Sequence, residues 1–372
     1  MPATFHWHTS ARIALASRDL AALRDAVLSR KGLRCGQDGV TTHEGSGLLC
    51  ETSGSSGRPK VIRRSVGSWQ ASFAVNSVAL GLGPQDCVAV FSGFGASLAL
   101  YGALEGAHHG ASLVSLATTP PQHWASTLAD HGDATLYITP TQLALLCKPG
   151  RILPDVRHIL VGGGTLSPAA AAAARTICPA ARLTQFYGAA ETSFVTWTDD
   201  ATPPGSVGKP YPGVTLRLDD DGLIWVRSPY LFEGYAAGSS ADTRWSDGFL
   251  SVGEVGRCDD AGNLFILGRR SRMVTVADHN VFPEAAEVCL ADMVPGATVA
   301  VIALPDDLRG NRLVACIAGP VAAAPEDLAR ACRAALGPHA APHRIHLMDV
   351  LPMLPSGKPD YAAITAVAQW LA

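Results

Sequence analysis

Short apolar runs alternate with helix-like segments from about residue 48 to residue 190, and this alternation constrains the fold more than any other feature of the chain. The expected strands are residues 87–91, 112–117, 134–139, 157–161 and 182–186. The expected helices between them are residues 97–110, 141–147 and 167–178. Such alternation is typical of a parallel sheet covered by helices on both faces, with ligands bound near the carboxyl ends of the strands.

The remainder of the chain has a different texture. After about residue 205, Asp-rich turns at 219–222 and 259–262 each separate two β-type runs, as in hairpins. Beyond a boundary at 268–272 an α+β pattern follows, with expected helices at 283–293 and 325–336 and expected strands at 298–304 and 313–318. Because 372 residues exceed what one core usually organises, we expect two domains.

Composition and charge exclude several classes of protein. Hydrophobic residues make up 48% and charged residues 16% of the chain, as in soluble globular proteins. A net charge of −3 provides no general attraction to nucleic acid, so we expect no nucleic-acid partner. The longest apolar stretch, 96–117, is interrupted by Glu105, His108 and His109, and we expect no membrane insertion. Nine scattered cysteines and no secretory pattern predict reduced thiols in a cytoplasmic protein.

A loop rich in glycine and hydroxyl side chains follows the strand-like run at 48–50 and ends at Lys60. Gly54 and Gly57 allow several backbone N–H groups to point at one place, which forms a nest for an anion such as a polyphosphate. The loop lacks the Lys-Ser/Thr pair of a Walker A motif, and a flexible surface loop is the alternative interpretation. The predicted phosphate-binding residues are Thr52, Ser53, Gly54, Ser55, Ser56, Gly57 and Lys60.

Four further motifs follow this loop in order. They are 185–192 (QFYGAAET), 205–210 (GSVGKP) with 223–228 (LIWVRS) and 233–235 (EGY), 245–257 (ending GEVGR) with 266–269 (ILGR), and 354–359 (LPSGKP). Taken singly, each has a structural explanation, such as a core aromatic for Tyr187 or a surface lysine for Lys358. Together with the loop they resemble the adenylate-forming superfamily of acyl- and aryl-CoA synthetases, peptide-synthetase adenylation domains and firefly luciferase. The resemblance covers about residue 48 to residue 361.

This resemblance implies an α/β fold with a large N-terminal domain of parallel α/β sheets plus a β-rich subdomain (1–267). A hinge at 268–272, with Ser271 at the pivot position, would join it to a small mobile α+β C-terminal domain (273–372). The implied reaction has two halves. A carboxylic acid first attacks the α-phosphate of Mg·ATP, which gives acyl-AMP and pyrophosphate; a thiol then displaces AMP. The implied cofactors are ATP, Mg²⁺ and coenzyme A or a carrier-protein phosphopantetheine.

The same resemblance implies roles for individual residues. The loop would cradle the leaving pyrophosphate, Glu191 would hold Mg²⁺, and Lys358 would bridge the carboxylate and the α-phosphate. Tyr187 would stack on adenine, and Glu254 with Arg269 would bind the ribose. Further expected nucleotide-binding residues are Gly162, Gly163, Gly164, Gly188, Ala189 and Ala190. The expected acyl-pocket residues are Ser92, Phe94 and Gly95.

The chain also departs from the family pattern. Ala190 replaces a threonine before Glu191, and Asp278 replaces a glycine that lines the pantetheine tunnel. An aspartate there would either narrow the tunnel or supply the same left-handed backbone. The phosphate loop also begins unusually early, as in short o-succinylbenzoate–CoA ligases.

The leading interpretation is an AMP-forming acid–CoA ligase for a small or medium acid, with a slight preference for an aromatic or unsaturated one because of Phe94 and Tyr187. One alternative is a ligase that loads an acyl carrier protein. The other is a degenerate relative that binds nucleotide without turnover, which Ala190 and Ser271 favour and Lys60, Glu191 and Lys358 oppose.

Overall fold

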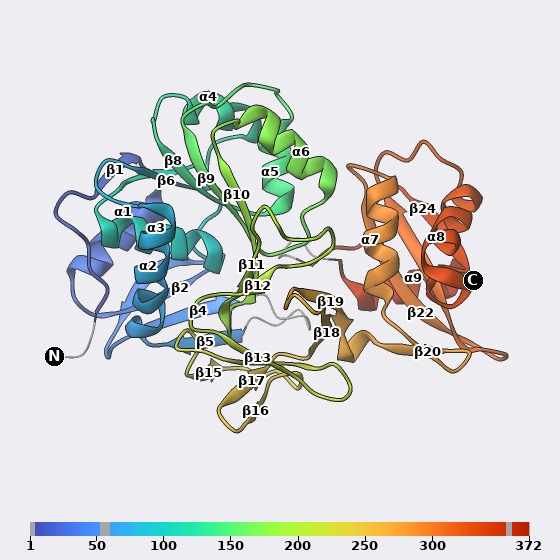
Figure 1. The fold of residues 1–372 in the computed structure, drawn as a ribbon. Coiled ribbons are helices and arrows are strands. Elements are labelled where there is room, and N and C mark those ends of the chain that lie inside the picture. Colours follow the sequence, from blue (N-terminus) through green and yellow to red (C-terminus); the bar gives the residue numbers. More distant parts are fainter. Residues whose placement is uncertain (1–3, 53–59, 355–358, 372) are drawn as a thin grey trace. The chain divides into compact units, whose positions relative to one another are not determined.

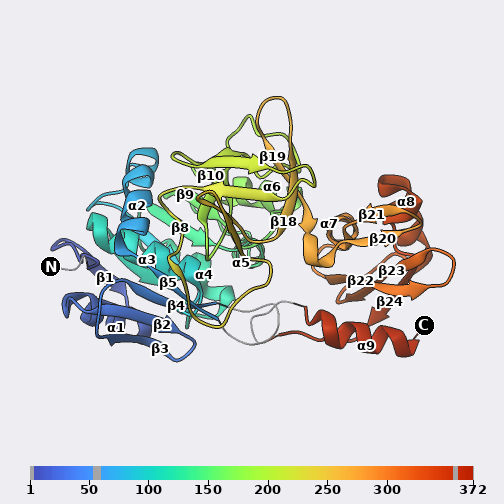
Figure 2. The ribbon, with the colours of Figure 1, turned by 90° about the horizontal axis from the view of Figure 1, so that it is seen from below.

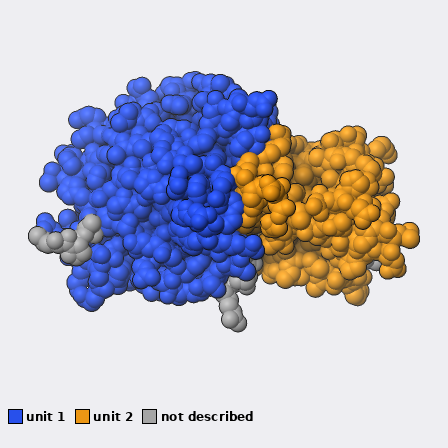
Figure 3. Space-filling model, turned by 60° about the horizontal axis from the view of Figure 1, so that its bottom comes forward, with its two compact units in different colours: residues 1–217, 225–252, 258–265 blue, residues 218–224, 253–257, 266–372 orange. Residues whose placement is uncertain are grey.

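The computed structural model describes residues 4–52, 60–354 and 359–371, which form two compact units (Figure 3). Unit 1 comprises residues 1–217, 225–252 and 258–265, and unit 2 comprises residues 218–224, 253–257 and 266–372. Six predicted site residues lie outside the described residues, namely Ser53, Gly54, Ser55, Ser56, Gly57 and Lys358. The predicted hinge at 268–272 stays a prediction.

An eight-stranded sheet forms the centre of unit 1 (Figures 1 and 2). Its order is β1 (Arg12–Leu15), β7 (Ser112–Ser115), β6 (Cys87–Val90), β8 (Ala134–Ile138), β9 (Val156–Val161), β10 (Arg182–Ala189), β11 (Ser193–Trp197) and β12 (Lys209–Pro210). The first six strands run parallel, and the last two are antiparallel additions. The predicted parallel sheet is therefore confirmed.

Both faces of this sheet are covered, as the apolar strands require. Along β6, Val88 and Val90 belong to one core cluster, whereas Cys87 and Ala89 belong to the other. The covering helices are α2 (Val66–Leu80) and α3 (Ser97–His109) in the first cluster, and α4 (Trp124–Leu128), α5 (Pro140–Cys147) and α6 (Pro168–Ile177) in the second. Local sequence sets the helix ends. Ser167 caps α6 at its N-terminus, and Gly110 ends α3 in a left-handed conformation.

A five-stranded sheet completes the framework of unit 1. Its order is β15 (Gly234–Ala237), β5 (Lys60–Arg64), β4 (Leu48–Thr52), β2 (Gly32–Gly36) and β3 (Gly39–His43), and α1 (Arg18–Leu28) packs beside β3. Sequence reasoning assigned no elements before residue 48, so it missed β1, α1, β2 and β3. It also missed α2, whose apolar residues show little helical periodicity.

Two predicted hairpins are present in the turn-rich region. The turn at 219–222 joins β13 (Thr215–Leu218) to β14 (Ile224–Arg227), and that at 259–262 joins β18 (Glu254–Cys258) to β19 (Leu264–Arg269). Beside β14 lie β17 (Phe249–Ser251) and then β16 (Arg244–Ser246).

The rest of unit 2 is built on a three-stranded sheet with helices on both faces. Its strands are β22 (Thr298–Asp306), β23 (Gly310–Ala318) and β24 (Arg344–Met348). Alternate residues of β23 face opposite ways, because Leu313 packs with α7 (Pro283–Met293) and α8 (Pro325–Ala340) while Val314 packs with α9 (Tyr361–Leu371). Before this sheet come a 3₁₀ turn, Arg270–Arg272, and the hairpin of β20 (Val274–Val276) and β21 (His279–Val281).

A carboxyl group lies at the centre of unit 1. Glu105 on α3 is fully buried and accepts a hydrogen bond from Asn76 Nδ2 (2.9 Å) and another from the Tyr137 hydroxyl. The Tyr101 hydroxyl donates a third bond at 3.3 Å. Burial raises the pKa of Glu105 to about 7 despite these donors.

This raised pKa predicts a pH-dependent stability. Between about pH 4.5 and 7 Glu105 stays protonated in the folded protein but ionises on unfolding, so stability falls as the pH rises through this window. Urea unfolding at pH 5 and pH 7.5 should show that Glu105→Gln removes up to about 3 kcal/mol of this fall. The exposed carboxyl variant Asp130→Asn is the control. An unchanged pH dependence in Glu105→Gln would contradict the prediction.

Candidate functional site

The carboxyl ends of four adjacent parallel strands converge at one edge of the large sheet. Ser92 follows β6, Thr139 follows β8, Gly162 follows β9 and Glu191 follows β10, and these strands are neighbours in the order β6-β8-β9-β10. The predicted segments 92–95, 162–164 and 187–191 are therefore brought to the edge where ligands bind in folds of this type.

Sequence reasoning missed Gln142, which connects two of these strand ends. Its side-chain Nε2 donates to Ser92 Oγ at 2.6 Å, while its Oε1 accepts from the Thr139 backbone N–H at 3.0 Å. The Thr139 hydroxyl in turn accepts from the Gln142 backbone N–H, which completes a capping box at the start of α5. The Thr-x-x-Gln spacing was readable in the sequence as a helix start.

Other residues predicted at this edge have packing roles. Phe94 is 1% exposed and lies within the hydrophobic core, and Gly95 sits against the backbone of Gly36. A Cβ at Gly162 would lie only 2.2 Å from the Phe186 ring, so that ring occupies the space that the glycine leaves. These contacts do not test the predicted acyl-pocket and nucleotide-binding roles, which stay predictions.

The two described ends of the predicted phosphate loop lie opposite each other. Thr52 ends β4, Lys60 begins β5, and the two are partners in the antiparallel register. The Lys60 ammonium lies 5.8 Å from the centre of the Tyr235 ring on β15. The hairpin thus delivers a lysine to an aromatic residue of the neighbouring strand.

Tyr235 also holds Glu191. Its hydroxyl donates to Glu191 Oε1 at 2.8 Å and lies 2.8 Å from Thr243 Oγ1. Since a phenol has one proton, donating it to the carboxylate leaves Thr243 as the donor to Tyr235. Burial raises the pKa of Tyr235 to about 12, so the hydroxyl keeps that proton at neutral pH. Sequence reasoning included Tyr235 in a motif but assigned it no role.

The turn that presents Glu191 is built by its own backbone and by Thr192. The Ala189 N–H donates to Thr192 Oγ1 at 2.9 Å, and the Thr192 N–H donates to the Ala189 carbonyl at 3.2 Å. The Glu191 carbonyl accepts from the Phe232 N–H at 2.8 Å. Ala190 packs against the hydrophobic core.

Gly188 precedes this turn at the tightest point of the β10–β11 pairing. A Cβ at Gly188 would lie 1.8 Å from the Ser193 carbonyl oxygen, so no larger residue fits without moving a strand. Tyr187, the predicted adenine-stacking residue, is half-buried on β10 opposite Thr196. Its role stays a prediction.

Unit 2 contains the two residues predicted to bind ribose. Glu254 Oε1 and Arg269 Nη2 lie 3.6 Å apart on β18 and β19, with the carboxylate the more buried of the two. The Arg269 backbone N–H also donates to Glu284 Oε1 at 3.2 Å. These two side chains are therefore adjacent, as a shared ribose site requires.

Arg272 follows the predicted pivot Ser271 and makes dense contacts within unit 2. It donates to both Glu287 carboxylate oxygens, lies 3.2 Å from Glu284 Oε1, and stacks 3.9 Å from the centre of the Tyr361 ring. Ser271 itself is exposed. Arg272 thereby ties the 3₁₀ turn to α7 and α9.

Asp278 adopts the left-handed backbone that the glycine would supply. Ala277 and Asp278 have φ of 47° and 65° and form the two-residue turn between β20 and β21. Aspartate tolerates this conformation better than most residues. The structure therefore supports the left-handed backbone as the explanation for the aspartate at this position.

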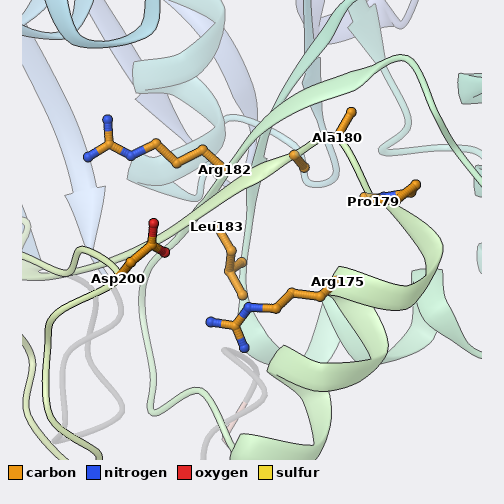
Figure 4. Close-up of a pocket in the computed structure, with 8 residues that line it drawn as sticks. Arg175, Pro179, Ala180, Arg182, Leu183 and Asp200 are labelled. Atoms are coloured by element: carbon orange, nitrogen blue, oxygen red, sulfur yellow. The ribbon is translucent and has the colours of Figure 1, made fainter.

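A shallow surface hollow of about 450 Å³ lies elsewhere on unit 1 (Figure 4). Arg175, Arg182, Leu183 and Asp200 are among its lining residues, and the guanidinium groups of the two arginines extend on either side of Leu183. None of the predicted site residues lines this hollow. It does not contribute to the candidate site.

The profile of the AMP-binding enzyme family matches residues 44–236, which is more than half of the chain. The chain belongs to the AMP-binding enzyme family. A second profile, the C-terminal domain of AMP-binding enzymes, matches residues 286–358. The two matched ranges contain Lys60, Tyr235, Glu191 and Lys358.

Individual relatives agree with this membership. The acyl-CoA ligase YhfT of Bacillus subtilis, itself uncharacterised, is 30% identical over 334 residues, covering 86% of this chain and 67% of the relative. A 2-succinylbenzoate–CoA ligase of Listeria monocytogenes is 29% identical over 325 residues, covering 82% of this chain and 67% of the relative. The chain thus spans about two thirds of the length of these two relatives.

A solved structure shares the fold of this AMP-binding enzyme. The o-succinylbenzoate-CoA synthetase of Bacillus subtilis, in complex with its acyl-adenylate intermediate, matches with a TM-score of 0.75 at 23% identity. The match covers 85% of this chain and 68% of the other. The combination of a large α/β domain and a small C-terminal domain is therefore that of the family.

The donor set of the AMP-binding enzyme fits Mg²⁺ carried by a nucleotide. Mg²⁺ usually takes one or two protein carboxylates and completes its shell with phosphate oxygens and water. Glu191, the residue predicted to hold Mg²⁺, would supply one carboxylate, which the Tyr235 hydroxyl orients. Among the described residues, no three His, Cys, Asp or Glu side chains converge on one point, and no helix has the length and apolar character of a membrane span.

The Gly188 contact makes a direct stability prediction. Gly188→Ala should lower the free energy of unfolding by about 3 kcal/mol, since the added methyl group meets a backbone carbonyl that cannot rotate away. Gly67→Ala, in the first turn of α2 with open space around it, should instead raise stability by about 0.5 kcal/mol. Urea denaturation measures both, and wild-type stability of Gly188→Ala would refute the clash.

Proposed function

We propose that this chain is an AMP-forming carboxylic acid–CoA ligase. The observation that carries the proposal is that Tyr235 contacts both charged residues in a member of the AMP-binding enzyme family. Its ring lies beside the Lys60 ammonium, and its hydroxyl donates to the Glu191 carboxylate. A lysine cation can bind the phosphate oxygens of a metal–polyphosphate complex, and a carboxylate can bind its metal ion. Because the chain retains both charges, turnover is favoured over the degenerate alternative.

In the first half-reaction an oxygen of the substrate carboxylate bonds to the α-phosphorus of ATP. The bond from that phosphorus to the bridging oxygen breaks, and pyrophosphate leaves with the bonding electrons. Lys60 stabilises negative charge on the departing phosphates, and the Tyr235 hydroxyl orients the Glu191 carboxylate. Mg²⁺, when bound, neutralises charge on the phosphate oxygens. The loop at 53–59 and Lys358 contribute as the family resemblance predicts.

In the second half-reaction a thiol loses its proton, its sulfur bonds to the acyl carbon, and AMP leaves with the electrons of the broken C–O bond. Coenzyme A is the acceptor that we propose. A carrier-protein phosphopantetheine presents the same thiol chemistry, so it is the alternative acceptor. The distinction depends on what surrounds the pantetheine arm, including Asp278.

Acid-dependent exchange of labelled pyrophosphate into ATP tests the first half-reaction. We expect one or more small or medium acids in a broad panel to support exchange, followed by acyl-CoA formation when coenzyme A is added. If none of the acids supports exchange, both ligase hypotheses are refuted and a nucleotide-binding relative without turnover is favoured. If exchange occurs but the thioester forms only on a phosphopantetheinylated carrier protein, that protein and not coenzyme A is the acceptor.

Tyr235→Phe tests the role of the hydroxyl group. The change leaves the ring beside Lys60 but removes the donor to Glu191, so kcat/KM for Mg·ATP in the exchange reaction should fall about 10- to 100-fold, as for loss of a hydrogen bond to a charged group. Tyr211→Phe is the matched control, because it removes a buried hydroxyl that donates to Asn76 in the core. It should lower stability and leave kcat/KM unchanged. Equal kinetic effects in both variants would contradict the assignment.

A further inference from the structure

Arg64 is an unusual residue for the interior of a protein. It ends β5, the strand that Lys60 begins, and its side chain is fully buried. Its neighbour Arg63 lies on the other face of the strand and is exposed. Arginine is almost never fully buried unless its charge is paired, so the position demands an explanation.

The guanidinium group of Arg64 binds oxygens from three separate segments. Nη2 donates to the Ala190 carbonyl at 2.5 Å, and Nη1 donates to the Tyr230 carbonyl at 2.5 Å and to Ser68 Oγ at 3.2 Å. The Arg64 Cζ atom also lies 5.5 Å from the centre of the Trp69 ring. The fork of five N–H donors makes this possible, and a lysine ammonium would not reach the same set.

Two of these acceptors lead directly to Glu191. Ala190 is the residue before it, so the Arg64 contact fixes the peptide group that joins Ala190 to Glu191. Tyr230 begins the segment whose Phe232 N–H binds the Glu191 carbonyl and whose Tyr235 hydroxyl binds the Glu191 carboxylate. Arg64 therefore contacts both the turn that carries Glu191, at Ala190, and the segment that binds Glu191, at Tyr230.

The charge of Arg64 is retained although its burial is costly. Burial lowers the pKa of Arg64 to about 10, which still leaves the group protonated at neutral pH. Glu191 and Glu233 are among the negative groups whose field favours the cation. Because an apolar side chain would fill the site at lower cost, the hydrogen bonds themselves are the reason to keep an arginine here.

We propose that Arg64 is a positioning residue that fixes the carboxylate of Glu191 relative to Lys60. It acts through the Ala190 carbonyl and the segment beginning at Tyr230, without touching the substrate. The proposal rests on the function proposed above, because Glu191 is the residue on which the nucleotide-bound metal depends. It assigns a role to Arg64, for which the sequence motifs gave no indication.

The test measures the Mg²⁺ concentration that gives half-maximal pyrophosphate exchange at fixed ATP. Arg64→Lys keeps the charge but loses the fork, so this concentration should rise about tenfold or more, as when partners behind a metal ligand are removed. Arg63→Lys, the matched exposed neighbour on the same strand, should leave it unchanged. A purely structural role for Arg64 would lower the maximal rate and the melting temperature without moving the Mg²⁺ requirement, and that result would overturn the proposal.

A second variant covers the case in which Arg64→Lys does not fold. Ser68→Ala removes one acceptor of the guanidinium and leaves the buried cation in place, so the Mg²⁺ requirement should rise in the same direction by a smaller factor. No shift in that variant would count against the proposal. A wild-type chain that shows no exchange with any acid overturns the proposed function and this inference together. A wild-type chain that exchanges, with Arg64→Lys behaving like Arg63→Lys, overturns this inference alone.

Discussion

The candidate site in unit 1 depends on the backbone pairing of β5 with β4 on one side and with β15 on the other. This pairing sets Lys60 opposite Thr52, and it places Tyr235 opposite Ile62, within reach of the Lys60 ammonium. β15 (Gly234–Ala237) comes much later in the chain than β5 (Lys60–Arg64), so the pairing closes a long loop. Every strand of the central sheet except β1 belongs to that loop, as does Glu191. Backbone hydrogen bonds therefore determine where the charged side chains meet.

Much of the fold was predictable because its driving pattern is local. The strands at 87–91 and 134–138 are buried on both faces and, apart from Thr135, consist of apolar or aromatic residues, and such runs are easily recognised. β2 and β3 were missed because part of each strand is exposed, so neither forms a continuous apolar run. The first part of α8 ends where it was predicted, because Gly337, which interrupts α8 with φ 81° and ψ 174°, directly follows residue 336.

The candidate site was predicted less completely than the fold. Motif residues such as Lys60 and Glu191 were named, and the structure connects them through one side chain. Arg64 and Thr243 were not named, because their contacts come from segments distant in sequence. A charged residue at a strand end reads as solvent-exposed in any local pattern, and only the tertiary fold shows that Arg64 is buried.

Gln142 uses its two amide atoms for two different purposes. Its oxygen caps α5, and its nitrogen holds Ser92 at the edge where the acyl pocket is predicted. The predicted acyl-pocket role of Ser92 would make substrate preference and helix stability depend on one side chain. An apolar residue in place of Ser92 would leave the amide nitrogen with only the longer bond to the Phe91 carbonyl, at 3.4 Å. Replacing Gln142 would remove the side-chain half of the capping box. With Ser92 in the predicted acyl-pocket role, changes in substrate range are expected to come as compensated pairs of substitutions at positions 92 and 142.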